Sequence, residues 1–123
     1  MEIRTVIRKG ATELKPAGKL DIEKAESFEL EFAKLLSQVK EKIVGLNLSR
    51  IEYIDSSGLG ALIKALNAAK NQGISMILFG APPKIQSIFQ IARLEKFFIF
   101  KSKSDFESTH PSAEDDEMDK LLG

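Results

Sequence analysis

Short apolar runs alternate along this chain with segments of helical periodicity, and that alternation most constrains its fold. Three runs are nearly continuously apolar: residues 43–48, 74–79 and 97–100. Three segments carry apolar residues three and four positions apart, which predicts amphipathic helices: residues 22–39, 59–69 and 85–92. Strands with continuous apolar runs are typical of parallel sheets covered by helices. The sequence therefore predicts an α/β fold with a mixed, mostly parallel central sheet of about five strands and helices packed on it.

The N-terminal residues predict a hairpin before this alternation begins. Residues 3–8 alternate loosely in polarity, Lys9-Gly10 interrupts them, and a second extended run covers residues 11–17. Asp21 is a favourable N-cap for the first helix, whose predicted buried stripe begins at Ile22. Residues 49–54 are expected to link the next strand to the second helix. The predicted order of elements is ββαβαβαβ.

Charge divides the chain into two unequal parts. Residues 1–103 carry 17 Lys and Arg against 11 Asp and Glu, whereas residues 104–123 carry one Lys against seven Asp and Glu. We therefore expect one domain over residues 1–107 and a flexible acidic tail over residues 108–123. The body is too weakly basic for a nucleic-acid footprint, and no apolar run is long enough to span a membrane. The expected partners include neither nucleic acid nor membrane.

The chain has few of the residues that usually catalyse reactions or bind metals. It contains no cysteine, and its single histidine, His110, falls in the predicted tail. No base–nucleophile pair is evident, because Asp55 and Ser57 are too close in sequence to be assumed a catalytic dyad. We therefore expect a binding module and not an enzyme, with no catalytic residue, no metal and no cofactor.

The segment Asp55-Ser56-Ser57-Gly58-Leu59-Gly60 departs from ordinary helix composition at a predicted strand-to-helix junction. Each glycine costs about 1 kcal/mol in a helix relative to alanine, which indicates a sharp bend or a close approach to the backbone. In one interpretation a residue among 55–57 caps the helix and the glycines pack. In another, a serine hydroxyl at the positive end of the helix receives a phosphate.

A dinucleotide site is a third interpretation, and the residues argue against it. Gly58-x-Gly60 begins the glycine fingerprint of such sites, but Ile63 occupies its third position. The acidic residue that would bind the ribose is also missing at the end of the next strand, around residues 78–80.

Residues 55–60 resemble the signature of STAS domains, and more narrowly of the bacterial anti-sigma factor antagonists. The resemblance covers about residues 2–107 and extends to these further segments: Gly18-Lys19-Leu20-Asp21, Leu46-Asn47-Leu48-Ser49, Tyr53-Ile54, Gly80-Ala81-Pro82-Pro83 and residues 97–100. Asn47 departs from the family, which commonly has Asp there. Because residue 47 lies near a predicted strand end, we expect this change to affect surface contacts and not the fold.

The resemblance implies a phosphorylation switch. In that family the second serine of the pair, here Ser57, is phosphorylated by an anti-sigma factor that is also a serine kinase. The unmodified protein binds this kinase and releases a sigma factor, and a PP2C-type phosphatase removes the phosphate. We expect a cytoplasmic monomer or weak dimer with these partner-binding residues: Asp21, Asp55, Ser56, Ser57, Gly58, Leu59 and Gly60.

A second class of function remains open, because STAS-like domains also serve as accessory subunits of lipid or anion transport complexes. The presence of both serines and the lack of a membrane domain favour signalling.

Three residues outside residues 55–60 also carry expectations. Tyr53 is expected to be half-buried beside this motif, and Lys84 and Arg93 are expected to lie on a solvated helix face. The phenylalanines of residues 97–100 are expected in the core.

Overall fold

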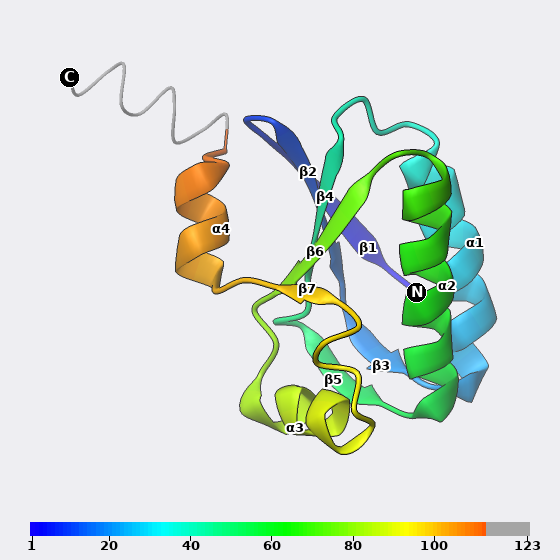
Figure 1. Cartoon of the computed structure of the whole chain (residues 1–123). Coiled ribbons are helices and arrows are strands. Elements are labelled where there is room, and N and C mark those ends of the chain that lie inside the picture. The colour runs from blue at the N-terminus through cyan, green and yellow to red at the C-terminus, as the bar shows by residue number, and fades with distance from the viewer. Residues whose placement is uncertain (113–123) are drawn as a thin grey trace.

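The computed structural model describes residues 1–112, and a five-stranded mixed sheet forms its centre (Figure 1). The strand order is β1-β2-β4-β6-β7; β1 and β2 pair antiparallel, and the other neighbours pair parallel. The strands have these bounds: β1 Ile3–Arg8, β2 Ala11–Pro16, β4 Ile43–Asn47, β6 Ser75–Phe79 and β7 Ile99–Phe100. The predicted fold class is therefore confirmed.

The N-terminal hairpin forms as predicted. Its register places Ile3 opposite Pro16 and Arg8 opposite Ala11. The turn includes Gly10, whose φ of +76° lies in the left-handed region that glycine adopts without steric cost. The second strand of this hairpin, β2, then pairs in parallel with β4 and so joins the hairpin to the rest of the sheet.

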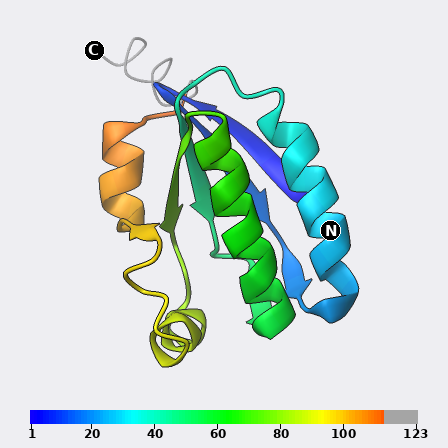
Figure 2. The same cartoon turned by 45° about the vertical axis from the view of Figure 1, so that its right-hand side comes forward.

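Two helices, α1 (Ile22–Leu36) and α2 (Ser56–Asn71), lie side by side on one face of the sheet (Figures 1 and 2). Alternate strand residues point into this layer and are fully buried: Leu14, Val44, Leu46, Met76 and Leu78. They belong to one core cluster with Phe28 and Phe32 of α1 and Leu62 of α2. Full burial of such a side chain contributes about 1.5–3 kcal/mol, so this layer is the main source of stability.

A helix that was not predicted, α4 (Lys103–Thr109), covers the opposite face of the sheet (Figure 2). Its Phe106 ring stacks on Phe79 with 4.3 Å between the ring centroids. Gly45 of β4 leaves room for this ring, because a Cβ at that position would collide with Phe106. Seven residues are too few for helical periodicity to stand out in a sequence, which explains the omission.

The packed domain extends beyond the predicted boundary at residue 107. His110 is 8% exposed, and its Nδ1 lies 2.8 Å from the Lys9 carbonyl oxygen. The Lys9 N–H in turn donates to the Pro111 carbonyl at 2.9 Å, and Ser112 bridges to Arg8. Residues 108–112 are therefore part of the domain, because they pack against the hairpin. The rest of the predicted acidic tail, residues 113–123, lies outside the described residues.

A buried polar network joins the hairpin to β4 on the α4 side. The Arg8 Nε donates to Glu13 Oε1 at 2.8 Å, and the Asn47 amide donates to Glu13 Oε2 at 3.3 Å. Arg8 also donates from Nη1 to the His110 carbonyl oxygen at 2.9 Å. The expectation that Asn47 affects surface contacts is wrong, since Asn47 is 2% exposed and supports the network.

A second, two-stranded sheet pairs β3 (Gly18–Leu20) in parallel with β5 (Ile51–Ile54). The expectation that residues 49–54 form only a linker is wrong, because residues 51–54 form strand β5. Strand β3 is followed directly by Asp21, the N-cap of α1, and strand β5 by Asp55, the N-cap of α2.

The last part of the sheet is shorter than predicted. Helix α3 (Pro83–Ile91) leads into a turn, and only residues 99–100 of the run 97–100 form β7. Phe98 is buried, as expected, but Phe97 is 47% exposed. None of the helices within residues 1–112 has the length and apolar character needed to cross a bilayer.

Candidate functional site

The N-termini of α1 and α2 meet at the side chain of Asp55. Its Oδ1 accepts from the Gly58 N–H at 3.0 Å and caps α2, while its Oδ2 accepts from the Ile22 N–H of α1 at 3.3 Å. Asp21 caps α1 by accepting from the N–H groups of Glu23 and Lys24. Helix N-termini carry unpaired N–H groups, so two carboxylates satisfy both helix ends and hold them together.

Gly58 allows the start of α2 to lie directly on β3. A Cβ at this position would collide with the Leu20 carbonyl oxygen and would stand 2.8 Å from the Ile54 side chain. Gly58 and Leu59 are both buried. The structure gives these two residues a packing role, and their contact with a partner stays a prediction.

Gly60 has no comparable role in packing. No heavy atom would lie within 4 Å of a Cβ placed there. Because glycine inside a helix costs about 1 kcal/mol relative to alanine, the stability of this domain alone would favour alanine. Gly60 is therefore a candidate functional residue, with a bare backbone at the surface of α2.

Neither serine of the pair caps the helix, because Asp55 does so. Ser56 is exposed and Ser57 is half-buried. No hydrogen bond joins either hydroxyl to another residue within 1–112. Ser57 is the second residue of α2, so its hydroxyl stands near the positive end of the helix dipole without an internal partner.

A groove between α1 and α2, which we call the Ser57 groove, has a volume of about 550 Å³. It is lined by Ile22, Ala25, Glu26, Glu29, Ser57, Gly60, Ala61 and Lys64. Lys64 Nζ lies 3.4 Å from Glu29 Oε1 across the groove. Two carboxylates and one ammonium group therefore line it, which leaves the groove with a net negative charge.

The structure brings together Asp21, Asp55 and Ser57, three of the predicted switch residues, at the meeting point of two helices. It adds Ile22, which was predicted to begin the buried stripe of α1 but is 74% exposed. The three-residue spacing from Ile22 to Ala25 matches a core position, so periodicity could not reveal this. The groove residues Glu26, Glu29 and Lys64 also went unpredicted, because charged residues on helices are ordinarily solvated. Tyr53, expected to be half-buried, is 43% exposed on β5.

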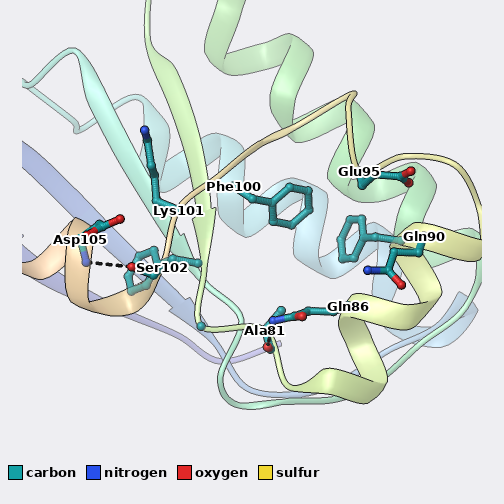
Figure 3. A pocket seen from close by; sticks show the side chains of 11 residues that line it. Ala81, Gln86, Gln90, Glu95, Phe100, Lys101, Ser102 and Asp105 are labelled. Carbon is teal, nitrogen blue, oxygen red and sulfur yellow. Dashed lines mark hydrogen bonds between the residues drawn. The ribbon is translucent and has the colours of Figure 1, made fainter.

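A separate cavity of about 610 Å³ lies between α3, β7 and the start of α4 (Figure 3). The rings of Phe89 and Phe100 line one side, and Gln86 and Lys101 contribute polar groups. None of the predicted switch residues lines this cavity, so it is distinct from the Ser57 groove. Among residues 1–112, no cluster of three or more His, Cys, Asp or Glu side chains could hold a metal ion.

The family model of the STAS domain matches residues 2–113, and this chain therefore belongs to the STAS domain family. It is 32% identical over 66 residues to the anti-sigma-B factor antagonist of Listeria monocytogenes serovar 1/2a. That match covers 53% of this chain and 58% of the Listeria protein, so the chain spans little more than half the length of that relative.

Two solved structures share the fold. A putative anti-sigma factor antagonist from Thermotoga maritima superposes with a TM-score of 0.73 at 24% identity, covering 87% of this chain and 92% of that one. The Bacillus cell fate determinant SpoIIAA in its phosphorylated form gives a TM-score of 0.62 at 16% identity, covering 88% and 98%. At these identities the similarity shows the fold alone.

Proposed function

We propose that this chain is an anti-sigma factor antagonist in which phosphorylation of Ser57 switches partner binding. The unmodified protein binds an anti-sigma factor that is also a serine kinase, and thereby frees a sigma factor in the cytoplasm. A PP2C-type phosphatase restores the unmodified form. The observation that carries the proposal is the Ser57 hydroxyl, which stands at the start of α2, on a groove, with no hydrogen bond to residues 1–112. The name of the Listeria relative supports the same class of function.

The face around Ser57 has the properties of a protein-binding surface. Ile22 exposes 74% of its surface beside the groove, although large aliphatic side chains are usually buried. Gly60 leaves the backbone of α2 bare, so a partner's main chain can approach closely. Protein interfaces typically combine an apolar centre with close packing. In the unmodified protein, Ile22 and Gly60 supply these two features in the groove that Ser57 also lines.

A phosphate on Ser57 would disrupt such an interface. Phosphorylation adds about −1.5 to −2 charges, in a groove where Glu26 and Glu29 already outnumber Lys64. An unpaired anion buried against a partner costs several kcal/mol. Since about 1.4 kcal/mol corresponds to a tenfold change in affinity, the modified protein would release its partner.

The switch does not require refolding of the domain. The Ser57 hydroxyl has no internal hydrogen bond to lose, and the capping of α2 depends on Asp55. The helix dipole favours an anion at an N-terminus by about 0.3–1 kcal/mol, which tends to stabilise the modified helix. The partner is therefore excluded by charge and by the volume of the phosphate.

Capture from an extract of the native cells tests the proposal. The immobilised chain is compared with Ser57→Ala and Ser57→Glu, and Ser56→Ala serves as the matched control. We expect the unmodified chain, Ser57→Ala and Ser56→Ala to retain an anti-sigma factor kinase, and Ser57→Glu to lose it. The captured kinase with ATP should then phosphorylate the wild-type chain and not Ser57→Ala.

Two results would contradict the proposal. Equal retention of the kinase by Ser57→Ala and Ser57→Glu would exclude a charge switch at this position. Capture of a transport ATPase instead of a kinase would favour the second class of function, an accessory subunit of a transport complex.

A further inference from the structure

Among the described residues that line the Ser57 groove, Lys64 is the only one with a positive charge. Its Nζ lies 3.4 Å from Glu29 Oε1, and the Lys64 side chain is 71% exposed. An exposed ion pair of this kind contributes little to stability, because solvent screens the charges and two long side chains lose rotational freedom. Lys64 can therefore exchange Glu29 for a stronger anionic partner at small cost.

Ser57 and Lys64 lie on the same side of α2. They are seven positions apart, which is close to two turns at about 3.6 residues per turn, so their side chains project in nearly the same direction. The rise along the helix axis between them is about 10.5 Å. Side chains on a helix lean toward its N-terminus, so the Lys64 side chain leans in the direction of Ser57.

The helix surface between these two residues carries almost no side-chain volume. Gly60 lies there, and a Cβ at position 60 would meet no heavy atom within 4 Å. Ala61, which also lines the groove, is buried and has only a methyl group. From its Cα, a lysine side chain reaches about 6 Å and a phosphoserine about 4 Å, given the usual bond lengths. Together these reaches match the axial separation, so an extended Lys64 can pass over Gly60 and meet a phosphate on Ser57.

The other charged groups around Ser57 are carboxylates. Glu26 and Glu29 of α1 line the same groove, and Asp55 caps α2 two residues before Ser57. A phosphate with about −1.5 to −2 charges attracts an ammonium group more strongly than one carboxylate does. Lys64 is thus the groove residue suited to neutralise a phosphate on Ser57.

We infer that Lys64 leaves Glu29 and binds the phosphate when Ser57 is phosphorylated. The inference rests on the proposed function, because it requires a phosphate at position 57. In the unmodified protein, the ion pair with Glu29 holds the Lys64 side chain across the groove and leaves Gly60 uncovered. In the modified protein, the Lys64 side chain lies over Gly60 and Glu29 loses its partner. A binding protein then loses access to the bare backbone of α2 and also meets the phosphate.

The pKa of the phosphate, from a phosphorus NMR titration of the full chain, tests this contact. Phosphoserine is encoded at position 57 during synthesis, so the measurement needs no kinase. The second pKa of phosphoserine is ordinarily about 6, and a neighbouring ammonium group lowers it by favouring the dianion. Lys64→Gln should therefore raise this pKa by about half a unit, less than for a buried pair because the groove is open to solvent. Lys64→Arg keeps the charge and should keep the lowered pKa.

Lys70→Gln is the matched control. Lys70 is also an exposed lysine of α2, it lies outside the groove, and it forms no ion pair within residues 1–112. Its removal should change the phosphate pKa by less than about 0.1 unit, because salt screens distant exposed charges. Equal phosphate pKa values in the wild type and Lys64→Gln, or equal shifts from Lys64→Gln and Lys70→Gln, would overturn the inference.

This inference and the proposed function fail separately. A chain that no kinase modifies at Ser57 would contradict the proposed function, whereas the encoded phosphate would still report on Lys64. A working kinase switch with a phosphate pKa that does not depend on Lys64 would contradict only the inference.

Discussion

The Asp55 carboxylate joins the first turns of two helices, because one oxygen caps α2 and the other accepts from the Ile22 N–H of α1 at 3.3 Å. Strands β3 and β5, which precede the two helices, are paired in parallel and bring these ends together. One side chain therefore fixes the position of Ser57 relative to the exposed Ile22. The mouth of the Ser57 groove depends on this connection.

Replacing Asp55 with alanine should destabilise the domain by about 1–2 kcal/mol, because loss of an N-cap costs about 1 kcal/mol and a second hydrogen bond is lost with it. The free energy of unfolding, from urea titration, measures this. Ser56→Ala is the matched control, since Ser56 is exposed and makes no hydrogen bond within residues 1–112; its effect should stay within about 0.5 kcal/mol. Equal effects of the two substitutions would show that Asp55 does not hold the helices.

The two glycines of α2 should respond in opposite directions to alanine. Gly58→Ala forces a Cβ into the Leu20 carbonyl oxygen and should destabilise the domain by at least about 2 kcal/mol. Gly60→Ala meets open space and should stabilise it by up to about 1 kcal/mol, because alanine is the better helix former. Thermal unfolding distinguishes the two variants. Gly60→Ala should nevertheless bind the anti-sigma factor more weakly; unchanged affinity would remove Gly60 from the partner surface.

The buried network of Arg8, Glu13 and Asn47 should contribute far more to the free energy of unfolding than a surface ion pair does. Glu13→Gln removes the carboxylate 2.8 Å from the Arg8 guanidinium, whose side chain is 9% exposed. Because Arg8 keeps a longer ion pair with Glu107 at 3.8 Å, the loss should be about 2 kcal/mol in unfolding free energy. Arg4→Gln breaks the 3.6 Å ion pair between Arg4 and Glu2, and both of these side chains are mostly exposed. This substitution should lower the free energy of unfolding by less than about 0.5 kcal/mol. Similar losses from both variants would mean that Arg8 is solvated in solution.

Phosphorylation at Ser57 should leave the stability of the domain almost unchanged. No internal hydrogen bond is broken, and the helix N-terminus favours the anion, so the free energy of unfolding should move by no more than about 1 kcal/mol. Urea titration of the phosphorylated and unmodified chains at the same ionic strength gives the difference. A loss of several kcal/mol would contradict this. It would mean that the phosphate acts by unfolding α2 and not by excluding the partner from the folded surface.

The sequence was sufficient for the fold class because the main strands and helices carry strong periodic patterns. The apolar run 43–48 and the glycine turn of the hairpin both lie where the structure has them, as β4 and Gly10. Three short elements escaped prediction: β3 has three residues, β5 has four and α4 has seven, too few to show a period. The fold of these segments depends on tertiary contacts, such as those of Phe106 with Phe79.

The candidate site was predictable in outline and not in detail. The motif at residues 55–60 indicated the candidate site, but the distinction between its glycines depends on the Leu20 carbonyl oxygen, far away in sequence. Likewise, Ile22 is exposed because it is the first residue of α1. Its N–H donates to Asp55, the N-cap of α2. Arg93 was expected on a helix face and instead occupies the turn after α3 with a positive φ. Local patterns cannot reveal such relationships, because they arise only when distant segments meet.

The affinity of the anti-sigma factor kinase for the unmodified and the Ser57-phosphorylated chain, measured by titration calorimetry, tests the central claim most directly. The account predicts that the phosphate weakens binding at least about 100-fold, which corresponds to about 2.7 kcal/mol. Dissociation constants that agree for the two forms would contradict it.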